Sequence, residues 1–328
     1  MSRPVVVTLA FSAAYIVLAF LGTIYGPMPI APARVFSASL TPAEQFVILH
    51  LRLPQILLVG IVGAALACSG AALQATFENP LADPGVLGVT GGASLGAVLA
   101  IHSGLAQALF LALPLSAFAG GLVASLLVYA LTYLGGRPTA YTLLLTGVAV
   151  GGMAVAGVSL VMVVTDQHRI QELLFWLVGG VRNQTWEHVG LAAPAVAAGV
   201  VGLLMLHRRL DALLLGEEQA LAVGVPVAAT RLWVLALASL ATGAATAVSG
   251  AIGFVGLMVP HLVRRWTGPR SLHLLPGCVA GGAAYLTACE LLSRALSEQF
   301  SLHLGILTAF LGGPAFLIVL RRMGTQRS

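Results

Sequence analysis

The chain has 328 residues, of which 59% are hydrophobic and 8% are charged, and its formal net charge is +5. A composition this apolar excludes a soluble globular domain of this length and predicts an all-α polytopic membrane protein. All 16 basic residues are arginines, so no lysine is present for a phosphate-binding loop, and any ATP hydrolysis has to occur in another polypeptide. The arginines are scattered between apolar stretches and form no basic face, so no nucleic-acid partner is expected.

Ten apolar stretches approach the roughly 20 residues that a helix needs to cross a bilayer. The expected spans are 4–25, 54–77, 86–102, 108–134, 141–165, 189–206, 232–250, 254–264, 273–293 and 304–320. The eighth stretch is short, but counting it places both termini on one side of the membrane. Most arginines then lie on the side of the N-terminus, namely Arg3, Arg137, Arg208, Arg209, Arg231, Arg264, Arg265, Arg270, Arg321, Arg322 and Arg327. The positive-inside rule therefore predicts that both termini are cytoplasmic.

Residues 74–92, QATFENPLADPGVLGVTGG, separate the second and third spans with unusually polar chemistry. Pro80 and Pro84 lack an amide proton and restrict the residues before them, so a helix cannot continue here. We expect the chain to break at a membrane boundary in this segment.

Two other segments do not span. Residues 166–188 contain a short apolar piece bounded by charge, and Trp176 and Trp186 are expected to anchor this outer segment at the membrane interface. Residues 207–231 are predicted to form two short amphipathic helices, broken at Gly216 and again at 224–226. This second segment is the longest hydrophilic stretch on the cytoplasmic side and the natural surface for a soluble partner.

The histidines and cysteines show no spacing that indicates a metal or catalytic site. The eight histidines show no HxxxH or Cys-His spacing, and the three cysteines lie in or beside apolar spans, so we expect no metal site, no cofactor and no disulfide framework. Glu290 is an acid near a membrane end, which suggests a function by default. Arg294 follows four residues later on the same helix face, and we favour a local ion pair.

Several motifs in the chain occur in a characteristic order. They are RLP at 52–54, GAALACSGAALQATFENPLADPGVLGVTGG at 63–92, LLLTGVAVGG at 143–152, FWLVGG at 175–180, LGEEQALAVGVP at 215–226, SGAIGFVGLMVPHLVR at 249–264 and LGILTAFLGGPAFL at 304–317. With these residues the chain resembles, over nearly its whole length, the permease subunits of bacterial ABC importers for iron siderophores, heme and cobalamin.

The resemblance implies a type II ABC importer permease fold, with residues 1–328 forming a single transmembrane domain of about ten helices. It further implies a homodimer embedded in the lipid of the inner membrane, with a central path for a metal chelate. Two ATPase subunits would lie below this dimer, and a periplasmic or lipoprotein substrate-binding protein would dock from outside. The chain itself would be a transport subunit and not an enzyme.

The resemblance also assigns the coupling segment at about 207–231. Gly216, Glu217 and Glu218 match the turn that inserts into a groove on the ATPase. The two carboxylates would offer charge-assisted hydrogen bonds to basic residues of that partner. A solvated loop with incidental acids is the alternative.

The inner gate is placed by the resemblance in two loops. Asn79 and Leu81 lie in the loop after the second span, and Ala140 and Tyr141 lie in the loop before the fifth. Small and polar residues usually fill the second loop in this family, so the large Tyr141 leaves the exact gate residue open. From the residues alone, Asn79 is equally compatible with a cap that holds the turn.

The resemblance implies that the binding protein docks against two outer arginines, Arg52 and Arg294. Gln55 stands where the family commonly has a second arginine after RLP, so one ion pair is absent or moved. Charges of this kind mainly steer encounter. Interfacial arginines that snorkel toward water are the alternative.

The main hypothesis is thus the membrane-spanning subunit of an ABC importer for an iron complex or related metal chelate, with siderophore, heme and cobalamin all compatible. An ion-coupled secondary transporter is the alternative, and it would need a membrane-embedded acid, for which Glu290 is the one candidate, and no coupling segment. A third class, an intramembrane enzyme, would need a catalytic pair, and the spans contain no Ser-His, Asp-Asp or HExxH arrangement.

Overall fold

The structure is a computed structural model that describes residues 2–26, 28, 30–37, 39–85, 88–134, 139–181, 184–300 and 302–324. Throughout these ranges the regular structure is helical, as predicted. Arg137 and Arg327, used above for the topology, and residues 182–183 of the outer segment lie outside the described residues.

Within the described residues, seven helices are long and apolar enough to cross a membrane, and most of their ends lie within five residues of the predicted spans. They are α1 (Arg3–Ile24), α4 (Leu53–Thr76), α7 (Ala112–Leu134), α8 (Ala140–Val164), α10 (Trp186–Met205), α13 (Val227–Ser249) and α15 (Ser271–Phe300). The helix of α4 is continuous with α3 (Pro42–Phe46) and a π-helical stretch, η1 (Val47–Arg52), so it begins earlier than predicted. Likewise, α15 runs seven residues beyond its predicted end at 293.

The other three predicted spans are helical but shorter in apolar length. They are α5 (Val89–His102), α14 (Val255–Thr267) and α16 (Leu304–Gly324). With 14 and 13 residues, α5 and α14 each reach only about 20 Å, less than the roughly 30 Å of a hydrocarbon core. The count of ten crossings therefore stays a prediction.

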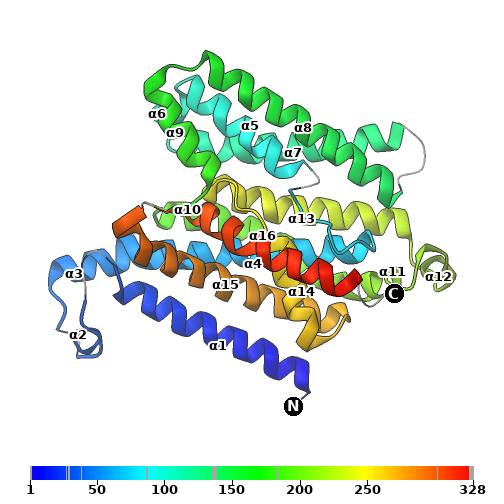
Figure 1. Ribbon diagram of the computed structural model, residues 1–328, viewed down its shortest axis with the longest axis horizontal. Coiled ribbons are helices and arrows are strands. Elements are labelled where there is room, and N and C mark those ends of the chain that lie inside the picture. Colours follow the sequence, from blue (N-terminus) through cyan, green and yellow to red (C-terminus); the bar gives the residue numbers. More distant parts are fainter. Residues whose placement is uncertain are drawn as a thin grey trace.

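The shorter elements gather at the two ends of the bundle (Figure 1). One end carries α2 (Pro32–Phe36), α3, α6 (Leu105–Ala108) and α9 (Gln167–Val178). The opposite end carries α11 (His207–Leu213) and α12 (Glu217–Ala222), and both chain termini lie toward it. This arrangement agrees with an even number of crossings.

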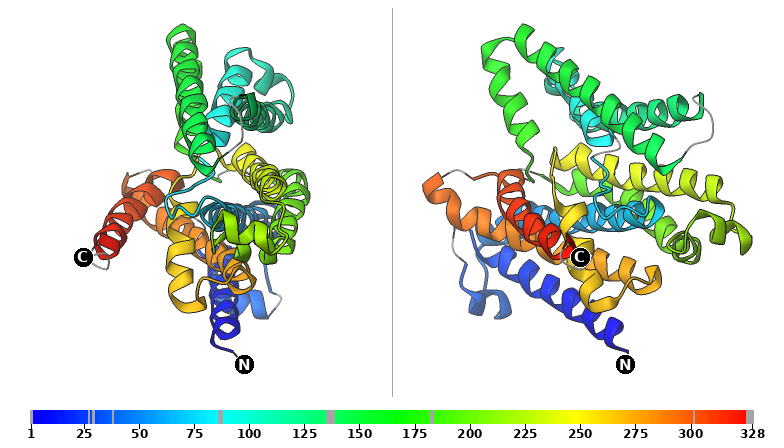
Figure 2. Two further views of the ribbon diagram at one scale, coloured as in Figure 1. Left: turned by 90° about the vertical axis from the view of Figure 1, so that its right-hand side faces the viewer. Right: turned by 45° about the vertical axis from the view of Figure 1, so that its right-hand side comes forward.

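Helix α4 lies in the centre of the bundle, surrounded by α10, α13, α14 and α15 (Figure 2). Close backbone approach makes this packing possible. A Cβ atom added to Gly63 would lie 2.2 Å from the carbonyl oxygen of Gly282 on α15, and one on Gly70 would lie 2.1 Å from that of Gly256 on α14. Small residues at such crossings allow membrane helices to pack by van der Waals contact. By contrast, α1 and α16 lie at the periphery.

Candidate functional site

The segment between α10 and α13 forms two short helices, α11 and α12. They are separated at Gly216, whose φ of 101° and ψ of 157° suit a residue without a side chain. A second break at Gly224, with φ of 81°, and Pro226 leads into α13. Both breaks are at the positions that the sequence predicts.

A small core of its own holds this segment together. Leu213 of α11, Ala220 of α12 and Val227 of α13 are buried against one another. Leu215 and Val223, in contrast, are about two-thirds exposed at the tip, which projects from the end of the bundle (Figure 1). The tip therefore combines a fixed shape with an uncovered apolar surface.

The two predicted coupling acids have different environments. Glu217 begins α12, and its Oε2 accepts a hydrogen bond of 2.9 Å from Nη2 of Arg231 on α13. The Arg231 side chain is 7% exposed and that of Glu217 is 51% exposed, so the pair reaches from the surface into the bundle. Glu218, one residue further, is exposed.

Asn79 holds the turn after α4. Its side-chain Oδ1 accepts a hydrogen bond of 2.9 Å from the backbone amide of Leu81, and its own backbone amide donates to the carbonyl oxygen of Gln74 at 3.2 Å. This is an Asx turn. The side chain of Leu81 is exposed. The structure thus gives Asn79 the turn-holding role and leaves Leu81 uncovered.

The remainder of this loop packs against α14. Gln74 donates to the carbonyl oxygen of Gly256 at 3.1 Å and accepts from Nη2 of Arg264 at 3.0 Å. Asp83 accepts from the amide of Gly85 at 2.8 Å, and a Cβ atom on Gly256 would lie 2.6 Å from its other carboxylate oxygen. Burial raises the pKa of Asp83 to about 6, against the lowering effect of the Gly85 amide.

The second predicted gate loop leads into α8. Ala140 is the first residue of that helix, and Thr139 caps it in a reciprocal box with Thr142. Tyr141 is 71% exposed. Among the described residues, no hydrogen bond joins Tyr141 to Asn79 or Leu81.

Both predicted docking arginines are turned inward. Arg52 is 5% exposed, and its guanidinium donates to the carbonyl oxygens of Thr23 at 3.1 Å, Ile24 at 2.7 Å and Met28 at 2.6 Å. Arg294 donates to the carbonyl oxygen of Gly22 at 3.0 Å. The last carbonyl groups of a helix have no partner within it and carry partial negative charge. The two arginines thus stabilise the C-terminal end of α1.

Glu290 completes this cluster. Its Oε1 accepts from Nε of Arg294 at 2.9 Å, which confirms the predicted ion pair on one helix face, and from Nε2 of Gln55 at 3.2 Å. Gln55 thus serves as a donor to the buried acid.

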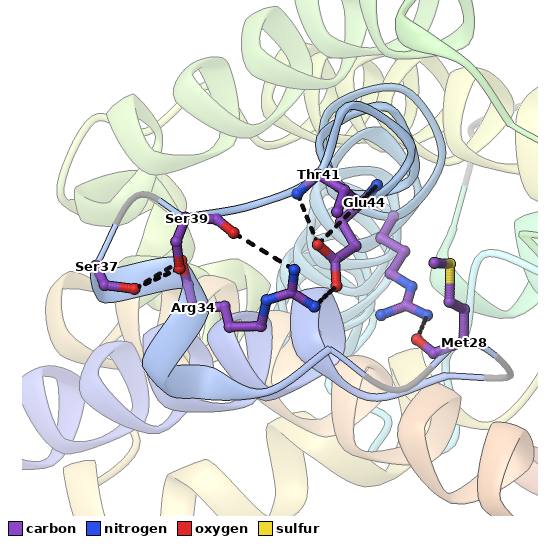
Figure 3. Close-up of polar contacts among 7 residues, drawn as sticks. Met28, Arg34, Ser37, Ser39, Thr41 and Glu44 are labelled. Carbon is purple, nitrogen blue, oxygen red and sulfur yellow. Dashed lines mark hydrogen bonds and ion pairs between the residues drawn. The ribbon is translucent and has the colours of Figure 1, made fainter.

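Arg34 is a half-buried arginine on α2, at the same end of the bundle (Figure 3). Its Nη1 donates to Oε1 of Glu44 at 2.7 Å, and its side chain is 43% exposed. The other oxygen of Glu44 accepts from the amide and the hydroxyl of Thr41 in a capping box. The sequence offered a signal for this arrangement in TPAE at 41–44, a helix start with a proline at the first position.

Comparisons with known proteins cover almost the whole chain. The signature of the FecCD transport family matches residues 14–322. The cobalamin import system permease protein of Halobacterium salinarum is 41% identical over 90% of this chain and 78% of its own. The hemin transport system permease protein of Yersinia pestis is 36% identical over 95% of this chain and 94% of its own. A solved ABC transporter described as of metal-chelate type, in an inward-facing conformation, superposes with a TM-score of 0.88 at 31% identity, covering 96% of this chain and 98% of that one.

Proposed function

This chain belongs to the FecCD transport family and is the membrane-spanning subunit of an ABC importer, and we propose that its cargo is a metal chelate of the cobalamin or heme class. It is a transport component, not an enzyme. Family membership favours this function over an ion-coupled transporter. The 41% identity to a cobalamin permease over most of both chains carries the cargo proposal.

The assembly that we propose is a homodimer with two ATPase subunits at the end that bears α12. Three features of the α12 tip support this proposal. The tip protrudes, its leucine and valine side chains are uncovered, and Glu218 is exposed beside Glu217 and Gly216. An apolar surface rimmed by carboxylates suits a groove lined by apolar and basic residues. In this assembly the whole chain acts as one transmembrane domain.

For the inner gate we propose Leu81 and Tyr141, each of which presents a large exposed side chain next to a helix end. Asn79 shapes the turn that carries Leu81, and Ala140 begins the helix that carries Tyr141. A second subunit would bring the equivalent residues to the other side of the path. Closing of the path would then depend on movement of two turns that are stiff in themselves.

For docking of a substrate-binding protein we propose the opposite end, where Arg52 and Arg294 hold the end of α1. Through these bonds they would fix the shape of the docking surface. Arg34, which is more exposed, would supply a positive charge to an acidic partner. This end would face the periplasm, and both termini would be cytoplasmic in the inner membrane.

The cargo proposal is tested by uptake into liposomes that contain the permease with its ATPase and binding protein. We expect ATP-dependent accumulation of cobalamin or hemin and competition between labelled and unlabelled forms of the same chelate. Accumulation of a ferric siderophore, with neither cobalamin nor hemin transported, would contradict the cargo class while leaving the importer function intact.

A further inference from the structure

The coupling segment is joined to the membrane helices by two acids that lie on different short helices. The first acid, Glu217 at the start of α12, pairs with Arg231 on α13. Because Arg231 is nearly buried and belongs to the first turns of a spanning helix, the pair ties the exposed tip to the interior of the bundle.

The second acid is Asp211 on α11. Its Oδ1 accepts a hydrogen bond of 2.6 Å from the backbone amide of Ser271, the first residue of α15. Ser271 is buried, and an amide in the first turn of a helix has no partner within that helix. A carboxylate at this place also interacts favourably with the positive end of the helix dipole. Asp211 thus binds the end of a second spanning helix.

Movement of the tip would act on both contacts together. The shared core of Leu213, Ala220 and Val227 keeps α11, α12 and the start of α13 in fixed relation. Leu210 of α11 is fully buried in the main core of the bundle. The two acids are therefore carried by one packed unit and do not lie on mobile loops.

Helix α15 connects this unit to the other end of the molecule. It has 30 residues, about 45 Å of helix. The amide of its first residue, Ser271, donates to Asp211. Its last turns carry Glu290 and Arg294, which bind Gln55 and the end of α1. Close packing of Gly282 against Gly63 of α4 lies between the two ends. One continuous helix thus spans the distance between the coupling segment and the proposed docking surface.

We propose that Glu217 and Asp211 are positioning residues that connect the proposed ATPase contact to two membrane helices, α13 and α15. Glu217 acts through Arg231 on α13, and Asp211 acts through the Ser271 amide on α15. This inference rests on the proposed importer function. It gives Glu217 and Glu218 different roles: Glu217 binds Arg231 within the subunit, whereas Glu218 contacts the ATPase.

The first test is a charge exchange at the α13 contact in the complete importer, reconstituted with its ATPase and binding protein. Glu217→Arg and Arg231→Glu each place like charges together and should lower the number of chelates transported per ATP by about threefold, a modest factor because the Glu217 side chain is half exposed and solvent screens the pair. The double variant restores opposite charges and should recover most of that ratio. Glu217→Gln, which keeps the shape of the side chain, should give an intermediate ratio.

The matched control is Arg265→Gln, which removes an exposed charge at the end of α14, and it should leave the ratio unchanged. Amounts of co-purified ATPase report assembly separately. If the single variants assemble and keep the wild-type ratio, or if the double variant is no better than the singles while Glu217→Gln matches wild type, the Glu217 role is wrong. Absence of ATP-dependent uptake by the wild-type importer would instead overturn the proposed function.

The second test addresses α15. Asp211→Ala removes the acceptor, whereas Asp211→Asn keeps an oxygen at the same place and removes the charge. We expect Asp211→Ala to lose most of the stimulation of ATP hydrolysis by the binding protein, by about tenfold for the loss of a partner to a buried amide, and Asp211→Asn to keep a larger share. Equal stimulation in wild type and Asp211→Ala would contradict a role of α15 in this signal.

Discussion

Variants of the pair Glu290–Arg294 can distinguish whether Glu290 stabilises the fold or takes part directly in transport. The side chains are 3% and 12% exposed, and their atoms lie 2.9 Å apart. Removing one member of a buried pair leaves an uncompensated charge and costs about 3–5 kcal/mol, while removing both members is often nearly neutral. We therefore expect Glu290→Leu and Arg294→Met to destabilise the protein strongly when made singly.

The double variant should recover much of this loss. It still gives up the hydrogen bonds from Gln55 to Glu290 and from Arg294 to Gly22, at about 1 kcal/mol each. The net cost of the double variant is then about 2 kcal/mol, less than that of either single change.

Thermal unfolding of the purified permease in detergent measures the effect. A conversion of ~2 °C per kcal/mol gives a fall in Tm of about 6–10 °C for each single variant and about 4 °C for the double. Single variants as stable as wild type, or a double variant less stable than both, would refute the reasoning. Glu290→Gln with normal stability and no transport would identify an acid that serves transport directly.

Three further predictions follow from single contacts. Gly63→Ala should destabilise the protein by about 1–3 kcal/mol because its Cβ would lie 2.2 Å from the Gly282 carbonyl oxygen. Gly152→Ala, with open space around the added Cβ, is the control and should leave Tm unchanged. Equal Tm values for the two variants would contradict this prediction. The pKa of Asp83 rises from 3.8 to about 6 on folding, so the folded state holds its proton more tightly and stability should fall as pH rises from about 4 to 6. Asp83→Asn should flatten that part of the stability profile, and an unchanged slope would disprove it. Arg34→Gln should slow association of the binding protein most at low salt, which stopped-flow mixing measures; a salt-independent effect would exclude steering by this charge.

The apolar runs of the sequence predicted the helices well because each run is long, continuous and punctuated by glycine, proline or charge. The helices α1 and α8 lie within one residue of where those runs place them. The breaks at Gly216 and at 224–226 were also predictable, since glycine and proline act on the local backbone. The short α5 and α14 also lie within three residues of their predicted bounds, but helices of 14 and 13 residues do not show whether the chain crosses the membrane there.

Most contacts of the site residues could not be predicted from the sequence. Arg52 binds carbonyl groups 24–29 positions away, and Asp211 binds an amide 60 positions away. Such partners depend on which helix ends meet in space, and a backbone donor or acceptor leaves no mark in the identity of its residue. Glu290–Arg294 was predictable because helical spacing alone brings the two side chains together.

ATP-driven uptake by the reconstituted importer, measured with and without an ion gradient, tests the central claim most directly. The permease with its ATPase and binding protein should accumulate the chelate only when ATP is present, and dissipating proton and sodium gradients should not reduce the rate. Uptake by the permease alone, driven by an imposed gradient and indifferent to ATP, would contradict an ABC importer and restore the ion-coupled transporter.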